Sequence, residues 1–244
     1  MVYHPVVDLD HNQVVQLEAL IRWQHPIYGT LMPTGFIHVA ETSGDISGIF
    51  KTIYRHTLMQ LKKWQRKNPN LSLSINLSAG QLTVEDFSDY LIRVAEEVGI
   101  QSDRLIFEIT ETTLLHVVET VRTNIRAIRG HGFKLALDDF GMEYSSLAML
   151  EKVGFDMIKI DRFFVSNFEE SFVAKEIIKM IGSIIKGLDK QSIVEGVETE
   201  QQLKTMQALG FSWIQGFYFS KPLPVKDVEP FLKTFEKSQK QRKG

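Results

Sequence analysis

Short β-rich runs alternate with helical segments along almost the whole chain, and this alternation constrains the fold more than any other feature. Strand–helix–strand units build parallel sheets, and eight strands in about 250 residues are typical of an α/β fold, the TIM-like (β/α)₈ barrel. Asp10, His11 and Asn12 form a turn between the first two runs, which predicts a hairpin and therefore one antiparallel strand near the N-terminus. The predicted strands are 2–9, 14–21, 71–77, 105–109, 134–137, 157–160, 192–194 and 213–219, and the predicted helices are 36–41, 49–67, 87–98, 115–129, 145–152, 173–186 and 200–209.

Composition narrows the class of protein. The chain has 244 residues, 43% of them hydrophobic, and we expect a single barrel domain over 1–235 followed by a disordered basic tail at 236–244. A net charge of −2 offers no basic surplus for a nucleic-acid polymer, and no apolar run is long enough to span a membrane. The absence of cysteine fits a reducing compartment, the cytoplasm. We expect the domain to be excised from a larger protein. A membrane anchor elsewhere in that parent protein is compatible with this segment, which is expected to make no membrane contact.

Polar residues lie within or just beyond every predicted strand after the first. A single acidic residue in such a place usually caps a helix or is solvated. In a barrel, however, the carboxyl ends of all parallel strands meet at one mouth, so carboxylates there would repel one another unless cations lie between them. The residues at these positions are Glu18, Arg22, Asn76, Glu108, Glu111, Asp138, Asp139, Lys159, Asp161, Glu195, Glu198 and Gln215.

The types of these residues indicate a metal site. Carboxylate oxygens with one amide favour Mg²⁺ or Mn²⁺ over zinc. The adjacent pair Asp138 and Asp139 suits two ions, and two ions about 3.5 to 4 Å apart clamp an in-line phosphoryl displacement, so the pattern predicts phosphoester hydrolysis. Lys159 is placed to orient or help deprotonate a metal-bound water, and Arg22 offers a planar fork to a phosphate oxygen. An enolase-like Mg²⁺ enzyme is a further alternative, which the paired aspartates and Asn76 disfavour.

Seven motifs occur in order along the chain: LEALIRWQHP at 17–26, NLSAGQL at 76–82, FEITET at 107–112, LALDDFG at 135–141, IKIDRFFV at 158–165, EGVET at 195–199 and QGFYFSKPLP at 215–224. Together they resemble the EAL domains, which are bacterial cyclic di-GMP phosphodiesterases. The resemblance extends from Tyr3 to about Phe231. It implies a barrel with one antiparallel strand, in agreement with the opening hairpin.

The resemblance also implies hydrolysis of cyclic di-GMP to linear pGpG by two Mg²⁺ or Mn²⁺ ions per active site. It assigns Glu18, Asn76, Glu108 and Asp138 to the first ion, and Asp138, Asp139 and Glu195 to the second. Lys159 would contact the nucleophilic water, with Glu195 as the candidate base. The substrate-binding residues would be Leu20, Arg22, Asp161, Glu198, Gln215 and Phe217, and Glu111 would anchor the loop after Asp139. The implied partners are cyclic di-GMP, a second copy of the chain bound through the helix 145–152, and sensory or GGDEF domains of the parent chain.

Four positions depart from the usual family pattern. His4 stands where glutamine is usual, Gly80 where arginine is common, and Met142 and Glu143 replace the threonine and glycine of the usual DDFGTGYSS. If that glycine adopts a special backbone angle, Glu143 strains the loop. The hypothesis is that metal binding survives and that turnover or its regulation is altered. The alternative is a catalytically impaired EAL domain that acts as a cyclic di-GMP receptor or regulatory module.

Overall fold

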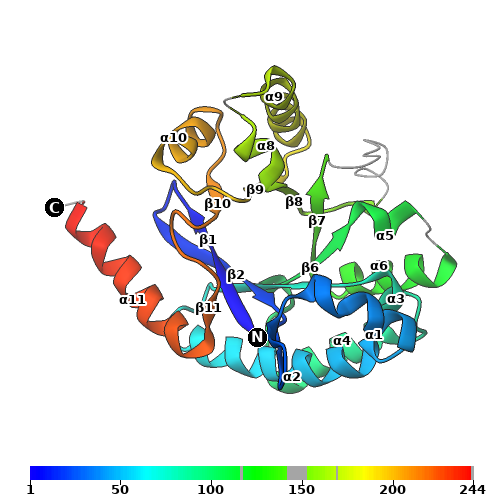
Figure 1. Ribbon diagram of the computed structural model, residues 1–244. Helices are drawn as coiled ribbons and strands as arrows, with labels where there is room; N and C mark the ends of the chain where they lie inside the picture. The colour runs from blue at the N-terminus through cyan, green and yellow to red at the C-terminus, as the bar shows by residue number, and fades with distance from the viewer. Residues whose placement is uncertain (116–117, 142–152, 169, 243–244) are drawn as a thin grey trace.

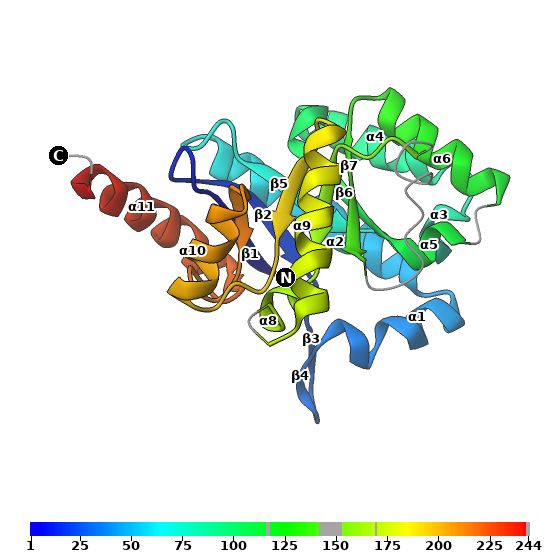
Figure 2. The same ribbon diagram turned by 90° about the horizontal axis from the view of Figure 1, so that it is seen from above.

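Eight strands close into a barrel with helices around its outside (Figures 1 and 2). The computed structural model of the chain describes residues 1–115, 118–141, 153–168 and 170–242. The barrel strands, in the order in which they pair, are β1 (Val2–Asp8), β2 (Gln13–Leu20), β5 (Ser72–Asn76), β6 (Leu105–Thr110), β7 (Lys134–Phe140), β8 (Met157–Ile160), β9 (Gln191–Val194) and β10 (Trp213–Gln215). Because β10 also pairs with β1, the ring is closed, and the predicted barrel is confirmed.

One barrel strand runs against the others. β1 is antiparallel to both of its barrel neighbours, β2 and β10, whereas every pair from β2 round to β10 is parallel. The short turn between β1 and β2 explains this, since such a turn joins only antiparallel neighbours. A further strand, β11 (Leu223–Pro224), pairs antiparallel with the first residues of β1. The predicted antiparallel strand near the N-terminus is therefore confirmed.

Helices link the parallel strands and cover the outer surface of the barrel (Figure 1). Thr199 caps one of them, α10: its hydroxyl accepts from the Gln202 backbone N–H, and the Gln202 side chain accepts from the Thr199 backbone N–H. Within the described ranges, none of the helices combines the length and the apolar character needed to cross a membrane. The α-helices are α1 (Ile37–Ser43), α2 (Ile46–Gln65), α3 (Ala79–Leu82), α4 (Phe87–Val98), α5 (Glu111–Leu115), α6 (Glu119–Gly130), α8 (Arg162–Ser166), α9 (Phe172–Gly187), α10 (Glu200–Ala208) and α11 (Val225–Arg242).

Several elements differ from the sequence prediction. The predicted helix 115–129 corresponds to α6, which begins at Glu119. The sequence does not predict α3, α5, α8, α11 or the hairpin of β3 (Trp23–His25) and β4 (Gly29–Leu31). Helix α11 continues to Arg242, where the sequence predicts a disordered tail, because the lysines, glutamines and arginine of that segment are good helix formers. The predicted helix 145–152 and the loop residues Met142 and Glu143 lie outside the described residues.

The strand β10 ends at Gln215 and not at 219, because the backbone leaves the sheet at Gly216. The Val197 N–H donates to the Gln215 carbonyl, and the Tyr218 N–H donates to the Val197 carbonyl. These hydrogen bonds turn the chain toward the segment after β9. Gly216 lies so close to Val197 that only a residue without a Cβ fits there.

Alternation along the strands sends side chains to two regions. The outward set is fully buried under the helices and includes Leu17, Leu73, Phe107, Leu135 and Ile158. The inward set forms a second apolar cluster of Val6, Ile106, Ala136, Met157 and Ile193. The next inward positions toward the carboxyl ends of the strands are polar, so the fold places a ring of polar side chains above an apolar floor.

A methyl group added at Gly216 would meet the Val197 carbonyl oxygen at 2.0 Å and the Val197 nitrogen at 2.5 Å. Because both are backbone atoms, neither can rotate away, and we expect Gly216→Ala to lower the free energy of unfolding by about 3 kcal/mol or more. Urea unfolding measures this. The matched control is Gly48→Ala in α2, where nothing lies within 4 Å of the added carbon; a gain of up to about 1 kcal/mol is expected there. Equal stability of the two variants would contradict the close approach.

Candidate active site

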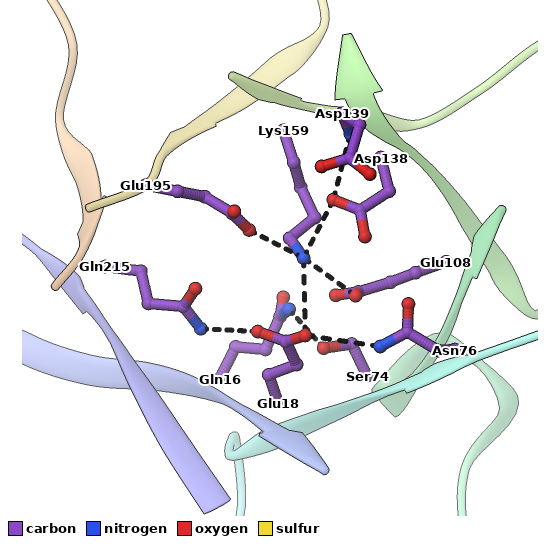
Figure 3. Close-up of polar contacts among 10 residues, drawn as sticks. All are labelled: Gln16, Glu18, Ser74, Asn76, Glu108, Asp138, Asp139, Lys159, Glu195 and Gln215. Atoms are coloured by element: carbon purple, nitrogen blue, oxygen red, sulfur yellow. Dashed lines mark hydrogen bonds and ion pairs between the residues drawn. The ribbon is translucent and has the colours of Figure 1, made fainter. Parts of the chain in front are cut away.

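The ammonium of Lys159 lies at the centre of the polar ring (Figure 3). Its Nζ is 2.7 Å from Glu195 Oε1, 2.8 Å from Glu108 Oε2, 3.1 Å from Asp138 Oδ1 and 3.5 Å from Glu18 Oε1. The lysine is only 1% exposed. A buried ammonium is tolerated when it is paired and hydrogen-bonded, and four carboxylates from β2, β6, β7 and the residue after β9 meet that requirement.

Two amides fix the carboxylate of Glu18 in addition to Lys159. Asn76 Nδ2 donates to Oε1 at 3.2 Å, and Gln215 Nε2 donates to Oε2 at 2.9 Å. Asn76 ends β5 and Gln215 ends β10, so the carboxylate is held from both sides of the barrel. Gln215, which the sequence assigns to substrate binding, is thus bonded to a candidate metal ligand.

A bulge in β7 directs two successive acidic side chains to the mouth. The register of β7 with β8 shifts between Leu137 and Phe140, and Asp139 has a φ of +55°, in the left-handed region that non-glycine residues rarely adopt. The Asp139 N–H donates to Asp138 Oδ1 at 3.1 Å. A regular strand would send the two side chains to opposite faces. Here both line the same cleft.

Glu111, the first residue of α5, contacts the end of β7. The Gly141 N–H donates to Glu111 Oε1 at 3.4 Å. Gly141 has a φ of +96°, which a glycine adopts readily. The contact lies at the start of the segment that Glu111 is expected to anchor, but residues 142–152 are outside the described ranges, so the anchoring role stays a prediction.

Burial and like charge raise the pKa of several of these carboxyls. Burial, followed by repulsion from Glu18, raises the pKa of Glu108 well above its ordinary value. Burial is also the main cause for Glu195, whose pKa rises to about 8 despite attraction from Lys159. The pKa of Asp139 rises to about 6, through burial and then repulsion from Asp138. Shifts of this size in a cleft are typical of functional sites.

The pKa values of Lys159 and Glu18 shift in the directions that keep both side chains charged. Burial disfavours the Lys159 ammonium, but the surrounding carboxylates outweigh it and raise its pKa well above the ordinary value. Burial likewise disfavours the Glu18 carboxylate, but Lys159, Gln215 and Asn76 outweigh it and lower its pKa. The centre of the site is therefore an ion pair at neutral pH.

The donor set suits a hard divalent cation, because it consists of carboxylate oxygens and the amide of Asn76. Glu108 Oε1 is buried and has no hydrogen-bond partner in the described part of the chain, so a cation would satisfy it. Among the described residues, however, no three acidic or imidazole side chains are arranged to hold a metal ion, since the carboxylates face Lys159. The oxygen donors of these residues are of the type that a divalent cation prefers. To bind one, the carboxylates would have to rotate away from the Lys159 ammonium.

A cleft of about 730 Å³ opens beside the charged cluster. Asn76, Asp138 and Asp139 line one side of it. Apolar side chains of β2, α1 and α2, among them Leu20, Ile37, Ile46 and Phe50, line much of the rest together with polar residues such as His38 and Thr113, and Met1 is also part of the lining. The cleft therefore joins the polar mouth to an apolar surface.

The other predicted substrate residues surround the mouth without entering the charged cluster. Arg22 is half-buried and donates to the Ile21 carbonyl at 2.7 Å. Asp161 caps α8 by accepting from the Phe163 N–H at 2.7 Å. Phe217 is half-exposed beside His4, with ring centroids 6.0 Å apart, and Glu198 is exposed.

Two polar residues below the ring are absent from the sequence prediction. Gln16 and Ser74 are hydrogen-bonded to each other and fully buried. Each lies two residues before a predicted ligand, Glu18 or Asn76, and therefore faces the same interior. Extending the period-two alternation back from those ligands would have found both.

With this geometry established, the comparisons identify the family: the EAL domain model matches residues 1–222, and the chain belongs to the EAL domain family. The cyclic di-GMP phosphodiesterase NbdA of Pseudomonas aeruginosa is 33% identical over 234 residues, which are 96% of this chain and 30% of NbdA. The solved structure of the PaMucR phosphodiesterase with c-di-GMP has a TM-score of 0.88 at 28% identity, covering 93% of this chain and 92% of that one. A Klebsiella pneumoniae BlrP1 complex with calcium and cyclic di-GMP has a TM-score of 0.80 at 27% identity, covering 91% and 55%.

The chain spans about a third of the length of the curated relatives that it matches, at 28%, 33% and 30% for three of them. The expected resemblance to the EAL family is confirmed. What the longer relatives do as whole proteins is a separate question from what this segment does.

The raised pKa of Glu195 predicts a pH dependence of stability without metal. Between its ordinary pKa near 4.5 and about 8, the folded protein binds more of this proton than the unfolded chain does, so stability falls as pH rises through that window. In a chelating buffer, we expect ionisation of Glu195 to lower the Tm as pH rises from 5 to about 8. The decrease should be smaller in Glu195→Gln, whose side chain cannot ionise. Identical dependence of Tm on pH in the two proteins would show that the pKa of Glu195 is not raised.

Proposed function

We propose that this chain is an active, metal-dependent phosphodiesterase that hydrolyses cyclic di-GMP to linear pGpG. The observation that carries the proposal is the convergence of the carboxylates of Glu18, Glu108, Asp138 and Glu195 on the Lys159 ammonium. Apolar residues would fill the end of a barrel at lower cost than five clustered ionisable side chains, so chemistry explains the cluster better than stability does. The EAL relatives named for cyclic di-GMP support the same substrate.

Two Mg²⁺ or Mn²⁺ ions per site are the proposed cofactors. Glu18, Asn76, Glu108 and Asp138 would hold the first, and Asp138, Asp139 and Glu195 the second. Such a pair supplies charge neutralisation at the phosphate and a bound water of lowered pKa. The bulge that turns both aspartates to the mouth supports their joint role. The calcium complex of BlrP1 is consistent with a divalent ion.

Lys159 and Glu195 would act on the attacking water. The ammonium donates to the water oxygen and orients it, and the Glu195 carboxylate accepts the proton as that oxygen bonds to phosphorus. The bond that breaks joins phosphorus to a ribose 3′-oxygen, which leaves as an alkoxide and takes a proton from solvent, so the ring opens to a terminal 5′-phosphate. Glu195 must be ionised for this step, and a neighbouring divalent charge would lower its pKa from about 8.

The dinucleotide would lie across the mouth and the cleft. Arg22 would contact a phosphate oxygen, Leu20 and Phe217 would contact the bases, and Asp161 and Glu198 would accept hydrogen bonds from them. Gln215 would act through Glu18, to which it is bonded. A cleft of about 730 Å³ is within the range of about 300 to 1,000 Å³ found for small-molecule sites.

A receptor that holds cyclic di-GMP without cleaving it is the second candidate. The observation in its favour is that the carboxylates are committed to Lys159 and not arranged around an ion. Homodimerisation through the segment 145–152, attachment to sensory or GGDEF domains, and a cytoplasmic location are further proposals that rest on the family alone.

Incubation of the chain with cyclic di-GMP and Mn²⁺, followed by chromatography, is expected to yield pGpG. Glu18→Ala removes a ligand of the first ion and should lower kcat by about 100-fold or more. The control is Glu176→Ala, an exposed residue of α9 paired with Lys179, which should retain the parent rate. Binding without product after long incubation would favour the receptor. Parent-like turnover by Glu18→Ala would reject the site.

A further inference from the structure

One polar pair interrupts the apolar interior directly below the charged cluster. Gln16 Nε2 donates to Ser74 Oγ at 2.9 Å, and both residues are 0% exposed. Gln16 precedes Glu18 by two residues on β2, and Ser74 precedes Asn76 by two on β5. The residues that otherwise fill this level of the barrel are apolar: Val6, Ile106, Ala136, Met157 and Ile193.

The oxygen of the Gln16 amide takes no part in the hydrogen bond to Ser74. Gln16 Oε1 is buried and has no hydrogen-bond partner within the described ranges. A buried amide oxygen without a donor is destabilising, and methionine would fill the same space without that cost. Figure 3 shows the Gln16 amide reaching from below into the cluster, toward the Lys159 ammonium. No hydrogen bond joins this oxygen to Lys159 within the described ranges, so the oxygen is an acceptor that is still available one level below the ammonium.

Lys159 will need such an acceptor when the carboxylates bind metal. Its ammonium has three N–H donors: Glu108 accepts a hydrogen bond from it at 2.8 Å, and Glu195 and Asp138 form ion pairs with it at 2.7 and 3.1 Å. These are groups that the proposed ions would draw away. The ammonium would then stay buried with fewer acceptors, which is unfavourable. Because Gln16 lies one level below the carboxylates, its oxygen can accept from the ammonium without displacing a metal ligand.

We propose that Gln16 is a positioning residue, which accepts a hydrogen bond from Lys159 in the metal-loaded protein and holds the ammonium against the attacking water. Ser74 fixes the orientation of the amide by accepting from Nε2. The inference rests on the proposed function and extends it, because it names the group that holds Lys159 once the carboxylates have turned away.

Three substitutions separate this role from simple packing. Gln16→Met keeps the length of the side chain and removes the acceptor, Gln16→Glu keeps an oxygen at that position, and Ser74→Ala removes only the partner of Nε2. We expect Gln16→Met to lower kcat by about 10- to 100-fold while KM and the Mn²⁺ dissociation constant, measured by calorimetry, stay within about twofold of the parent. Gln16→Glu should restore most of kcat, and Ser74→Ala, which keeps the acceptor but no longer fixes its orientation, should lower kcat by less than Gln16→Met does.

A second readout is independent of catalysis. In Mg²⁺-loaded protein without cyclic di-GMP, the Lys159 ammonium should give a slowly exchanging ¹H–¹⁵N NMR signal in the parent and in Gln16→Glu, and should lose it in Gln16→Met. Gln16→Met should unfold in urea at no lower concentration than the parent when metal is absent, because it removes a buried unpartnered oxygen. Gln16→Leu serves the same comparison if the methionine variant does not fold.

Parent-like kcat and a parent-like ammonium signal in Gln16→Met would overturn the inference. A loss of Mn²⁺ affinity equal to the loss of kcat would also overturn it, because Gln16 would then support the metal ligands and not Lys159. Absence of pGpG from the parent chain would reject the proposed function alone, and the NMR comparison would still decide whether Gln16 holds Lys159.

Discussion

The buried ammonium of Lys159 is the charge on which the mouth of the barrel depends. It lies within 3.5 Å of carboxylates from four separate places in the chain, and without it those carboxylates would repel one another in a region with little water. Unlike a bound ion, it is covalently part of β8, so it balances these carboxylates without any metal. In the proposed metal-loaded state, the same ammonium would compete with divalent ions for these carboxylates.

The site is built in levels by strand alternation. Polar side chains occupy the upper inward positions, Gln16 and Ser74 lie one step below, and apolar residues fill the remainder of that level. This arrangement excludes water from beneath the charges, which strengthens every electrostatic interaction above it. One irregularity is needed: only the bulge in β7 allows Asp138 and Asp139 to share a face.

The barrel, its antiparallel strand and the charged residues of the mouth could be predicted because they depend on local patterns. Alternation of strand and helix signals predicts the ring, and residues at or near the carboxyl ends of its parallel strands must meet at one mouth. Contacts between distant segments could not be predicted. Gln215 bonds Glu18 across 197 positions, and β10 ends where Gly216 meets Val197. Gln16 is absent from the prediction because it lies one level below the strand ends, from which the candidate site residues were predicted.

The reversed direction of β1 has a practical consequence for handling the protein. In a barrel made only of parallel strands, the first strand begins at the end remote from the mouth. Here β1 runs the other way, so the chain enters at the mouth, and Met1 is part of the lining of the cleft. A tag or fusion partner attached before Met1 would emerge beside the ligand-binding surface and compete for it. The end of α11, far from the strands at the mouth in Figure 1, is the safer point of attachment.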